Sequence, residues 1–135
     1  MGSSDEPSGS ESRDLSGMRI LVVEDSWPAG RALGRLLRAL GAEVSGPVAT
    51  AADAQRLATE TPPDAAIVDF NLRGGELADD LVEQLRGQGI HVVVTTGYSE
   101  LPRAPRHAVA VLHKPISEAA LLDSLQPKVA RKAQE

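Results

Sequence analysis

The sequence predicts an α/β fold in which helices cover both faces of a five-stranded parallel sheet. Short apolar, β-branched runs alternate along the chain with amphipathic stretches, and turn residues separate the two kinds of segment. This alternation is typical of βαβ units, which build a doubly wound sheet. A chain of 135 residues is long enough for one such domain and its core.

Five apolar runs are expected to form the strands, and they cover residues 18–23, 43–49, 65–69, 90–95 and 109–112. The stretches between them predict helices, because their leucines recur at helical spacing. Ser26, Thr50 and Ser117 stand where helix N-caps are expected. Pro127 should disturb the end of the last helix, since proline has no N–H to donate.

The stretch between the last two strands departs from this alternation. Residues 97–108 contain Pro102 and Pro105 and form a poor helical pattern. We therefore expect the fourth helix to be short or irregular.

Residues 1–17 are expected to be a disordered leader, and residues 18–135 to form the folded domain. The leader is rich in Ser, Gly and acidic residues and offers little apolar surface to bury. Its four carboxylates and single arginine give it a net charge of −3, out of −5 for the whole chain.

The composition excludes several classes of protein. There are no cysteines, so disulfides and thiolate metal sites are ruled out. The folded part is only mildly charged, and three aromatic residues are too few for a base-stacking surface, so no nucleic-acid partner is expected. No stretch resembles a membrane span or a signal peptide. We therefore expect a cytoplasmic protein without a membrane partner.

Polar side chains stand at the ends of four predicted strands. Ligands bind at the carboxyl ends of strands in open parallel sheets, so these side chains should meet at one edge. The residues concerned are Glu24, Asp25, Asp69, Thr95, Thr96 and Lys114.

This set of side chains suits phosphoryl chemistry. Clustered carboxylates repel one another unless a cation lies among them. Oxygen ligands without histidine or cysteine nearby favour Mg²⁺. A carboxylate can attack phosphorus to form an acyl phosphate, and a metal ion, an ammonium group and a hydroxyl can stabilise the transferring phosphoryl group. The strand ends therefore carry the parts needed to phosphorylate Asp69.

From about residue 18 to residue 126 the chain resembles a response-regulator receiver domain of two-component signalling. The matching motifs are the acidic pair Glu24-Asp25, the sequence DFN at 69–71, the sequence TGY at 96–98 and the pair Lys114-Pro115. The resemblance implies a flavodoxin-like fold with Asp69 as the phosphoacceptor.

The resemblance also implies roles for the neighbouring residues. Mg²⁺ would be held by Glu24, Asp25, Asp69 and the backbone carbonyl of Asn71. Thr96, which we favour over Thr95 because it directly precedes the Gly-Tyr of the motif, and Lys114 would each bind a phosphoryl oxygen.

Two features bear on regulation. Such domains usually carry Tyr or Phe three residues before the lysine, where this sequence has Val111. In the family this aromatic side chain moves inward when the threonine binds the phosphoryl group. Val111 and the proline-broken stretch therefore argue that this switch is altered here, whereas the residues expected to carry out the phosphorylation are all present. Tyr98, which follows Gly97 and lies two residues after the threonine, could gate water access to an acyl phosphate.

The resemblance implies a stand-alone receiver that takes phosphate from a histidine kinase or a histidine phosphotransfer protein and signals through protein contacts. It would catalyse only its own phosphorylation and dephosphorylation, so we do not expect an enzyme with a separate substrate. The alternative is a receiver-like binding module that works without phosphorylation, which the altered switch favours. A Mg²⁺-dependent phosphatase is disfavoured, because Asn71 stands where a second carboxylate would act as general acid.

Overall fold

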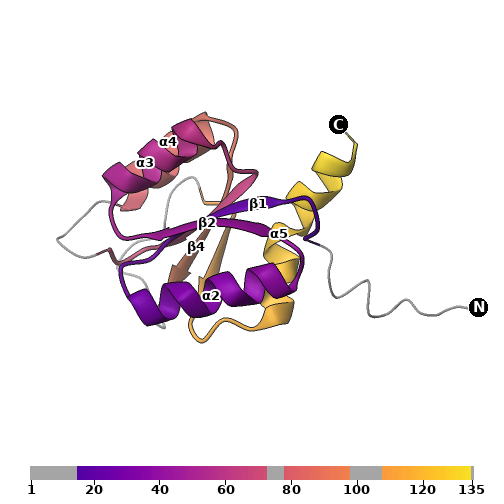
Figure 1. The fold of residues 1–135 in the computed structure, drawn as a ribbon, viewed down its shortest axis with the longest axis horizontal. Helices are drawn as coiled ribbons and strands as arrows, with labels where there is room; N and C mark the ends of the chain where they lie inside the picture. The colour runs from indigo at the N-terminus through magenta and orange to yellow at the C-terminus, as the bar shows by residue number, and fades with distance from the viewer. Residues whose placement is uncertain (1–14, 73–77, 98–107, 135) are drawn as a thin grey trace, which may run out of the picture.

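Five parallel strands form one sheet in the computed structural model, which describes residues 15–72, 78–97 and 108–134. Their order is β2-β1-β3-β4-β5, so β2 and β5 are the edge strands (Figure 1). The strands are β1 (Arg19–Val23), β2 (Glu43–Val48), β3 (Ala65–Asp69), β4 (His91–Thr96) and β5 (Ala110–His113). The predicted doubly wound, flavodoxin-like sheet is confirmed.

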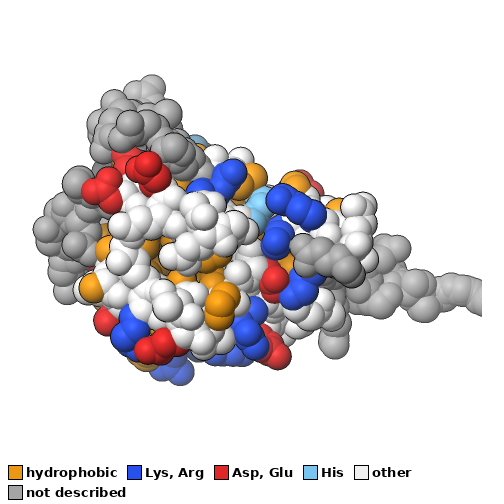
Figure 2. Space-filling model, turned by 90° about the horizontal axis from the view of Figure 1, so that it is seen from above, with side chains coloured by type: hydrophobic (Ala, Val, Ile, Leu, Met, Phe, Trp, Pro, Cys, Tyr) orange, Lys and Arg blue, Asp and Glu red, His pale blue; other side chains and the backbone are white. Residues whose placement is uncertain are grey.

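In the described residues, four helices cover the two faces of the sheet. They are α2 (Trp27–Ala39), α3 (Ala51–Glu60), α4 (Ala78–Gly87) and α5 (Glu118–Ala133). One hydrophobic cluster joins the sheet to α2 and α5, and the other joins it to α3 and α4. Figure 2 looks onto the α3 and α4 side, where charged side chains surround small apolar patches. None of the described helices is long and apolar enough to cross a membrane.

The central strands are buried on both faces, which explains their continuous apolar sequences. Successive side chains of a strand point to opposite faces. In β1, Ile20 and Val22 belong to the cluster under α2 and α5, whereas Leu21 and Val23 belong to the cluster under α3 and α4. The same alternation decides which side each residue at a strand end faces.

Two of the three predicted caps form. The Thr50 hydroxyl accepts a hydrogen bond from the Asp53 N–H at 3.1 Å, and the Ser117 hydroxyl accepts one from the Ala120 N–H at 3.0 Å. Ser26 occupies the N-cap position of α2, but its side chain makes no capping hydrogen bond. Its N–H donates instead to a carboxylate oxygen of Glu24 at 3.0 Å, so this residue supports the strand-end cluster.

The expected disturbance at Pro127 does not occur, because α5 continues through it to Ala133. Beyond the proline, Val129 packs against the core and the Lys132 ammonium lies 2.7 Å from a carboxylate oxygen of Asp64. A proline inside a helix costs about 3 kcal/mol. These tertiary contacts hold the last turns of the helix despite that cost.

The expected boundary after Gly17 is too late, because the fold already includes Leu15. This side chain is 0% exposed and packs in the cluster under α2 and α5. Its N–H donates to the Leu40 carbonyl at 3.1 Å, and its carbonyl accepts from the Met18 N–H at 3.0 Å. The rest of the expected leader, and residues 98–107 of the expected irregular fourth helix, lie outside the described residues.

Candidate functional site

The carboxyl ends of three strands bring Glu24, Asp69 and Lys114 into contact. Glu24 follows β1, Asp69 is the last residue of β3, and Lys114 follows β5. The Lys114 Nζ lies 2.9 Å from Glu24 Oε1 and 3.6 Å from Asp69 Oδ2. The expectation that side chains at the carboxyl ends of the strands meet at one edge is met by these three residues. Glu24 and Lys114 make contact although they are 90 residues apart in the sequence.

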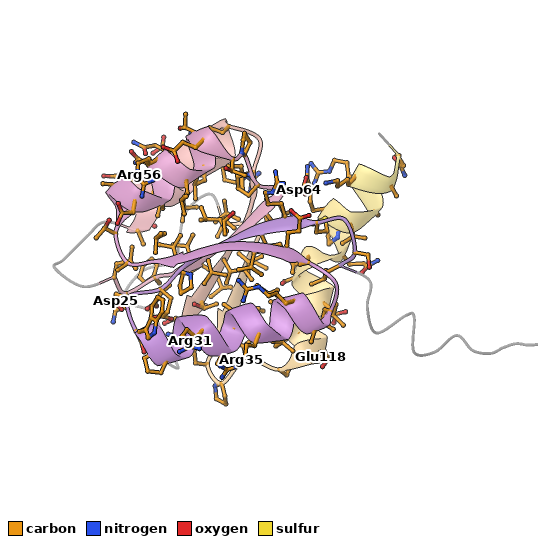
Figure 3. All side chains as sticks on the ribbon, viewed as in Figure 1. Asp25, Arg31, Arg35, Arg56, Asp64 and Glu118 are labelled. Atoms are coloured by element: carbon orange, nitrogen blue, oxygen red, sulfur yellow. The ribbon has the colours of Figure 1, made fainter. Side chains whose placement is uncertain are left out.

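Three carboxylates form a cluster that could hold a metal ion. Glu24, Asp25 and Asp69 each place one oxygen within 4.8 Å of the others. Glu24 and Asp69 are only 7% and 5% exposed, while Asp25, whose position is labelled in Figure 3, is half-buried. The donors are all hard oxygen atoms, so the set fits Mg²⁺ or a similar cation rather than a transition metal.

The surroundings of Asp69 oppose its ionisation in the absence of a metal. Burial raises the pKa of the Asp69 carboxyl, and the neighbouring Glu24 raises it further. The Asn71 N–H, which donates to Asp69 Oδ1 at 3.2 Å, and the Lys114 ammonium lower this pKa, but the rise prevails. A divalent cation among the carboxylates would relieve this cost.

Lys114 stays protonated although it is partly buried. Burial lowers the pKa of its ammonium, but the hydrogen bond to Glu24 and the charge of Asp69 more than compensate, so the pKa lies above its ordinary value. In the described chain this side chain therefore supplies a fixed positive charge beside Asp69.

The two threonines at the end of β4 are both buried, and they face opposite sides of the sheet. Thr95 pairs in register with Asp69, and its carbonyl accepts the Phe70 N–H at 2.8 Å. The Thr96 carbonyl accepts the Lys114 N–H at 2.8 Å. Both residues thus border the site, and the preference for Thr96 as the phosphate ligand stays a prediction.

A cavity of about 350 Å³ opens beside the cluster, and sequence reasoning missed it. Glu24, Thr95 and Lys114 form its polar side. Its apolar lining comes from α2 and from the chain after β5, namely Ala29, Ala32, Leu33, Leu36, Pro115 and Ile116. The sequence feature that could have predicted the cavity is a set of small and apolar residues on one face of α2. This set begins at Ala29, four residues after Asp25.

The remaining residues of interest are spread around this edge. Asn71 is exposed just after Asp69, and Gly97 is exposed at the end of β4. Val111 pairs with Val94 and packs against the cluster under α3 and α4. Tyr98 lies outside the described residues. The peptide bond between Lys114 and Pro115 is cis.

Comparison with known proteins identifies the architecture. No protein-family model matches the chain, and no curated protein matches its sequence. A solved CheY-like response regulator receiver domain from Methylobacillus flagellatus is 29% identical, with a TM-score of 0.72 over 82% of this chain and 98% of that one. The signal receiver domain of a modulated diguanylate cyclase from Desulfovibrio desulfuricans is 27% identical, with a TM-score of 0.76 over 87% and 98% of the two chains.

A third solved structure agrees with these two. The response regulator receiver domain protein from Clostridium thermocellum is 22% identical, with a TM-score of 0.75 over 87% of this chain and 98% of that one. The parallel sheet and its two helical layers are consistent with this architecture. The chain thus has the fold of response-regulator receiver domains over most of its length.

Proposed function

We propose that the chain is a phosphoacceptor receiver, in which Asp69 takes a phosphoryl group from a phosphohistidine of a histidine kinase or a histidine phosphotransfer protein. The observation that carries this proposal is the placement of a buried Asp69 carboxylate within 4.8 Å of two further carboxylates and 3.6 Å from the Lys114 ammonium. Nucleophile, metal ligands and cation thus meet at one strand edge.

In the transfer step an oxygen of Asp69 forms a bond to phosphorus while the bond from phosphorus to the donor imidazole nitrogen breaks. The imidazole leaves with the electron pair of the broken bond and is a neutral ring when it carries one proton. The product is an acyl phosphate on Asp69. Lys114 would stabilise charge on a phosphoryl oxygen. The chain would act on no separate substrate, because the group that it activates is its own side chain.

Mg²⁺ fits the acidic cluster, with Glu24, Asp25, Asp69 and the backbone carbonyl of Asn71 as the groups that would hold it. When bound, the ion would supply charge neutralisation for the phosphoryl oxygens. The raised pKa of Asp69 gives the chain a reason to require a cation, since the nucleophile must be ionised to react.

The apolar cavity beside Lys114 offers a place for the phosphodonor to dock. Leu33 and Leu36 on α2 and Ile116 after β5 are half-buried, so apolar side chains of a partner could cover them. A partner seated there would bring a histidine close to the strand ends. We propose that the protein works in the cytoplasm, where such donors act.

A second function, binding a partner without phosphorylation, is favoured by one observation. Val111 packs against the core at the position where receiver domains usually carry an aromatic side chain that moves. A module that keeps the fold and presents a constant docking face would need no such residue.

Intact-mass measurement in Mg²⁺ with a small-molecule phosphodonor tests the first function. The wild type should gain one phosphoryl group, and Asp69→Ala should gain none. Asp123→Asn, an exposed change on α5, is the matched control and should behave as the wild type. A wild type that neither gains phosphate nor changes its Trp27 fluorescence on Mg²⁺ addition would favour the binding module.

A further inference from the structure

The outer face of α2 carries a row of basic side chains next to an exposed tryptophan. Arg31, Arg35 and Arg38, here called the arginine stripe, follow one another at helical spacing and are all exposed. Trp27 is 59% exposed, and the Arg31 guanidinium lies 5.9 Å from the centre of its ring. Figure 3 labels Arg31 and Arg35 on this helix.

A groove of about 200 Å³ runs between this face of α2 and the edge strand β2. Gly30 lets the helix approach the strand closely, because a Cβ there would lie 2.7 Å from the Pro47 Cβ. The groove has arginine side chains of α2 on one wall and Pro47 of β2 on the other.

The stripe has no acidic counterpart in the ranges that the structure describes. Two other arginines there are paired: Arg19 lies 3.1 Å from Glu43, and Arg56 lies within 3.5 Å of both Asp53 and Glu60. No described carboxylate lies at ion-pair distance from any member of the stripe. Three like charges at this spacing repel one another, so an acidic ligand would relieve the repulsion.

We propose that the arginine stripe binds an acidic peptide segment, and that its occupant is residues 1–14 of this chain, here called the acidic segment. The acidic segment carries four carboxylates and one arginine, a net charge of −3 that matches three guanidinium groups. These charged residues are Asp5, Glu6, Glu11, Arg13 and Asp14. The proposal does not depend on phosphorylation of Asp69.

The described residue to which the acidic segment is attached lies near one end of the stripe. The next residue along the chain, Leu15, is hydrogen-bonded to the Leu40 carbonyl, two residues beyond Arg38. Fourteen extended residues reach about 46 Å, whereas a helix as long as α2 spans about 20 Å. The acidic segment can therefore reach every arginine of the stripe, and Trp27 at its far end.

Each ion pair between the acidic segment and the stripe would contribute little binding free energy, but the covalent attachment of the segment to the domain favours docking. Exposed ion pairs contribute little individually. A short tether raises the effective concentration to the millimolar range, so an affinity in that range leaves the acidic segment docked about half of the time. The interaction should weaken with salt, because exposed charges are screened. When docked, the acidic segment would cover Trp27, two residues from the metal-ligand candidate Asp25.

Quenching of Trp27 fluorescence by acrylamide, a neutral quencher, tests the proposal on the full chain. The variant Asp5→Asn/Glu6→Gln/Glu11→Gln/Asp14→Asn removes the charge and keeps the length. At low salt its quenching constant should exceed that of the wild type by up to roughly twofold, given a segment docked half of the time. The difference should vanish at high salt. Equal quenching of the two proteins at low salt would overturn the proposal.

A second pair of variants locates the binding surface. Arg35→Gln/Arg38→Gln should raise the quenching of the wild type and leave the neutral-segment variant unchanged, because both changes remove one interaction. Arg56→Gln, an exposed change on α3, is the matched control and should have no effect. A quenching difference that grows with protein concentration would assign the occupant to a second copy and refute the tethered arrangement.

Discussion

Replacing Asp69 by asparagine should stabilise the metal-free protein. The Asp69 side chain is buried beside two other carboxylates, and the Lys114 ammonium lies closer to Glu24 than to Asp69. Asparagine keeps the shape and can still accept the Asn71 N–H, but it removes the buried charge. Because the folded state opposes the charge on Asp69, we expect a gain in unfolding free energy of about 1 kcal/mol, the usual size of a single-substitution effect.

Urea unfolding at pH 7.5 in a chelator measures this gain, with Asp123→Asn as the exposed control. Because the folded-state pKa of Asp69 is raised, the wild type loses stability as the pH rises above 3.8, its ordinary value, and the two proteins should converge below it. Mg²⁺ at ten times its dissociation constant should restore about 1.4 kcal/mol to the wild type and less to Asp69→Asn. An asparagine variant that is no more stable than the wild type in chelator would refute this reasoning.

Three further predictions concern neighbouring groups. Lys114→Ala should tighten Mg²⁺ binding several-fold, because its ammonium no longer competes for Glu24; a Trp27 fluorescence titration measures this, and unchanged affinity would contradict it. Thr96→Val should slow phosphorylation more than Thr95→Val, as followed by intact mass, and the opposite order would assign the role to Thr95. Burial lowers the pKa of His91, so its contribution to stability is complete above pH 6.5 and is lost as the pH falls; urea midpoints from pH 7.5 to 5.5 should fall less in His91→Gln.

The fold was largely predictable because its central strands are buried on both faces. β1, β3 and β4 lie inside the sheet, so their sequences are continuous apolar runs between polar turns. The caps at Thr50 and Ser117 are local hydrogen bonds between residues three apart, which a short stretch of sequence specifies.

The predictions of the domain boundary and of the helix end at Pro127 were wrong, because contacts between residues far apart in the sequence override the local sequence pattern there. Leu15 lies in a stretch rich in serine, glycine and acid, and only its hydrogen bond to Leu40 and its place in the core make it part of the domain. The local sequence around Pro127 predicts the end of a helix. The helix continues because Lys132 contacts Asp64, a residue 68 positions away in the sequence. No local sequence pattern reports such a contact.

The sequence predicts which residues lie at the candidate site, but not which of their side chains contact one another. The rule that ligands bind at the carboxyl ends of parallel strands selects Glu24, Asp69 and Lys114. That Lys114 donates to Glu24 at 2.9 Å, and lies farther from Asp69, depends on side-chain positions that follow only from coordinates. The cavity between α2 and the chain after β5 likewise depends on how the helix is placed against the sheet.

The path of α5 has a practical consequence for experiments on this protein. After β5 the helix runs back along the sheet, and Lys132 binds both Asp64 and the carbonyl of Gly17 at the edge where the strands begin. The C-terminal end of α5 therefore lies across the molecule from Asp25 (Figures 1 and 3). A strand of five residues spans about 17 Å, so a dye or an affinity handle attached beyond α5 should leave the carboxylate cluster at the strand ends unobstructed.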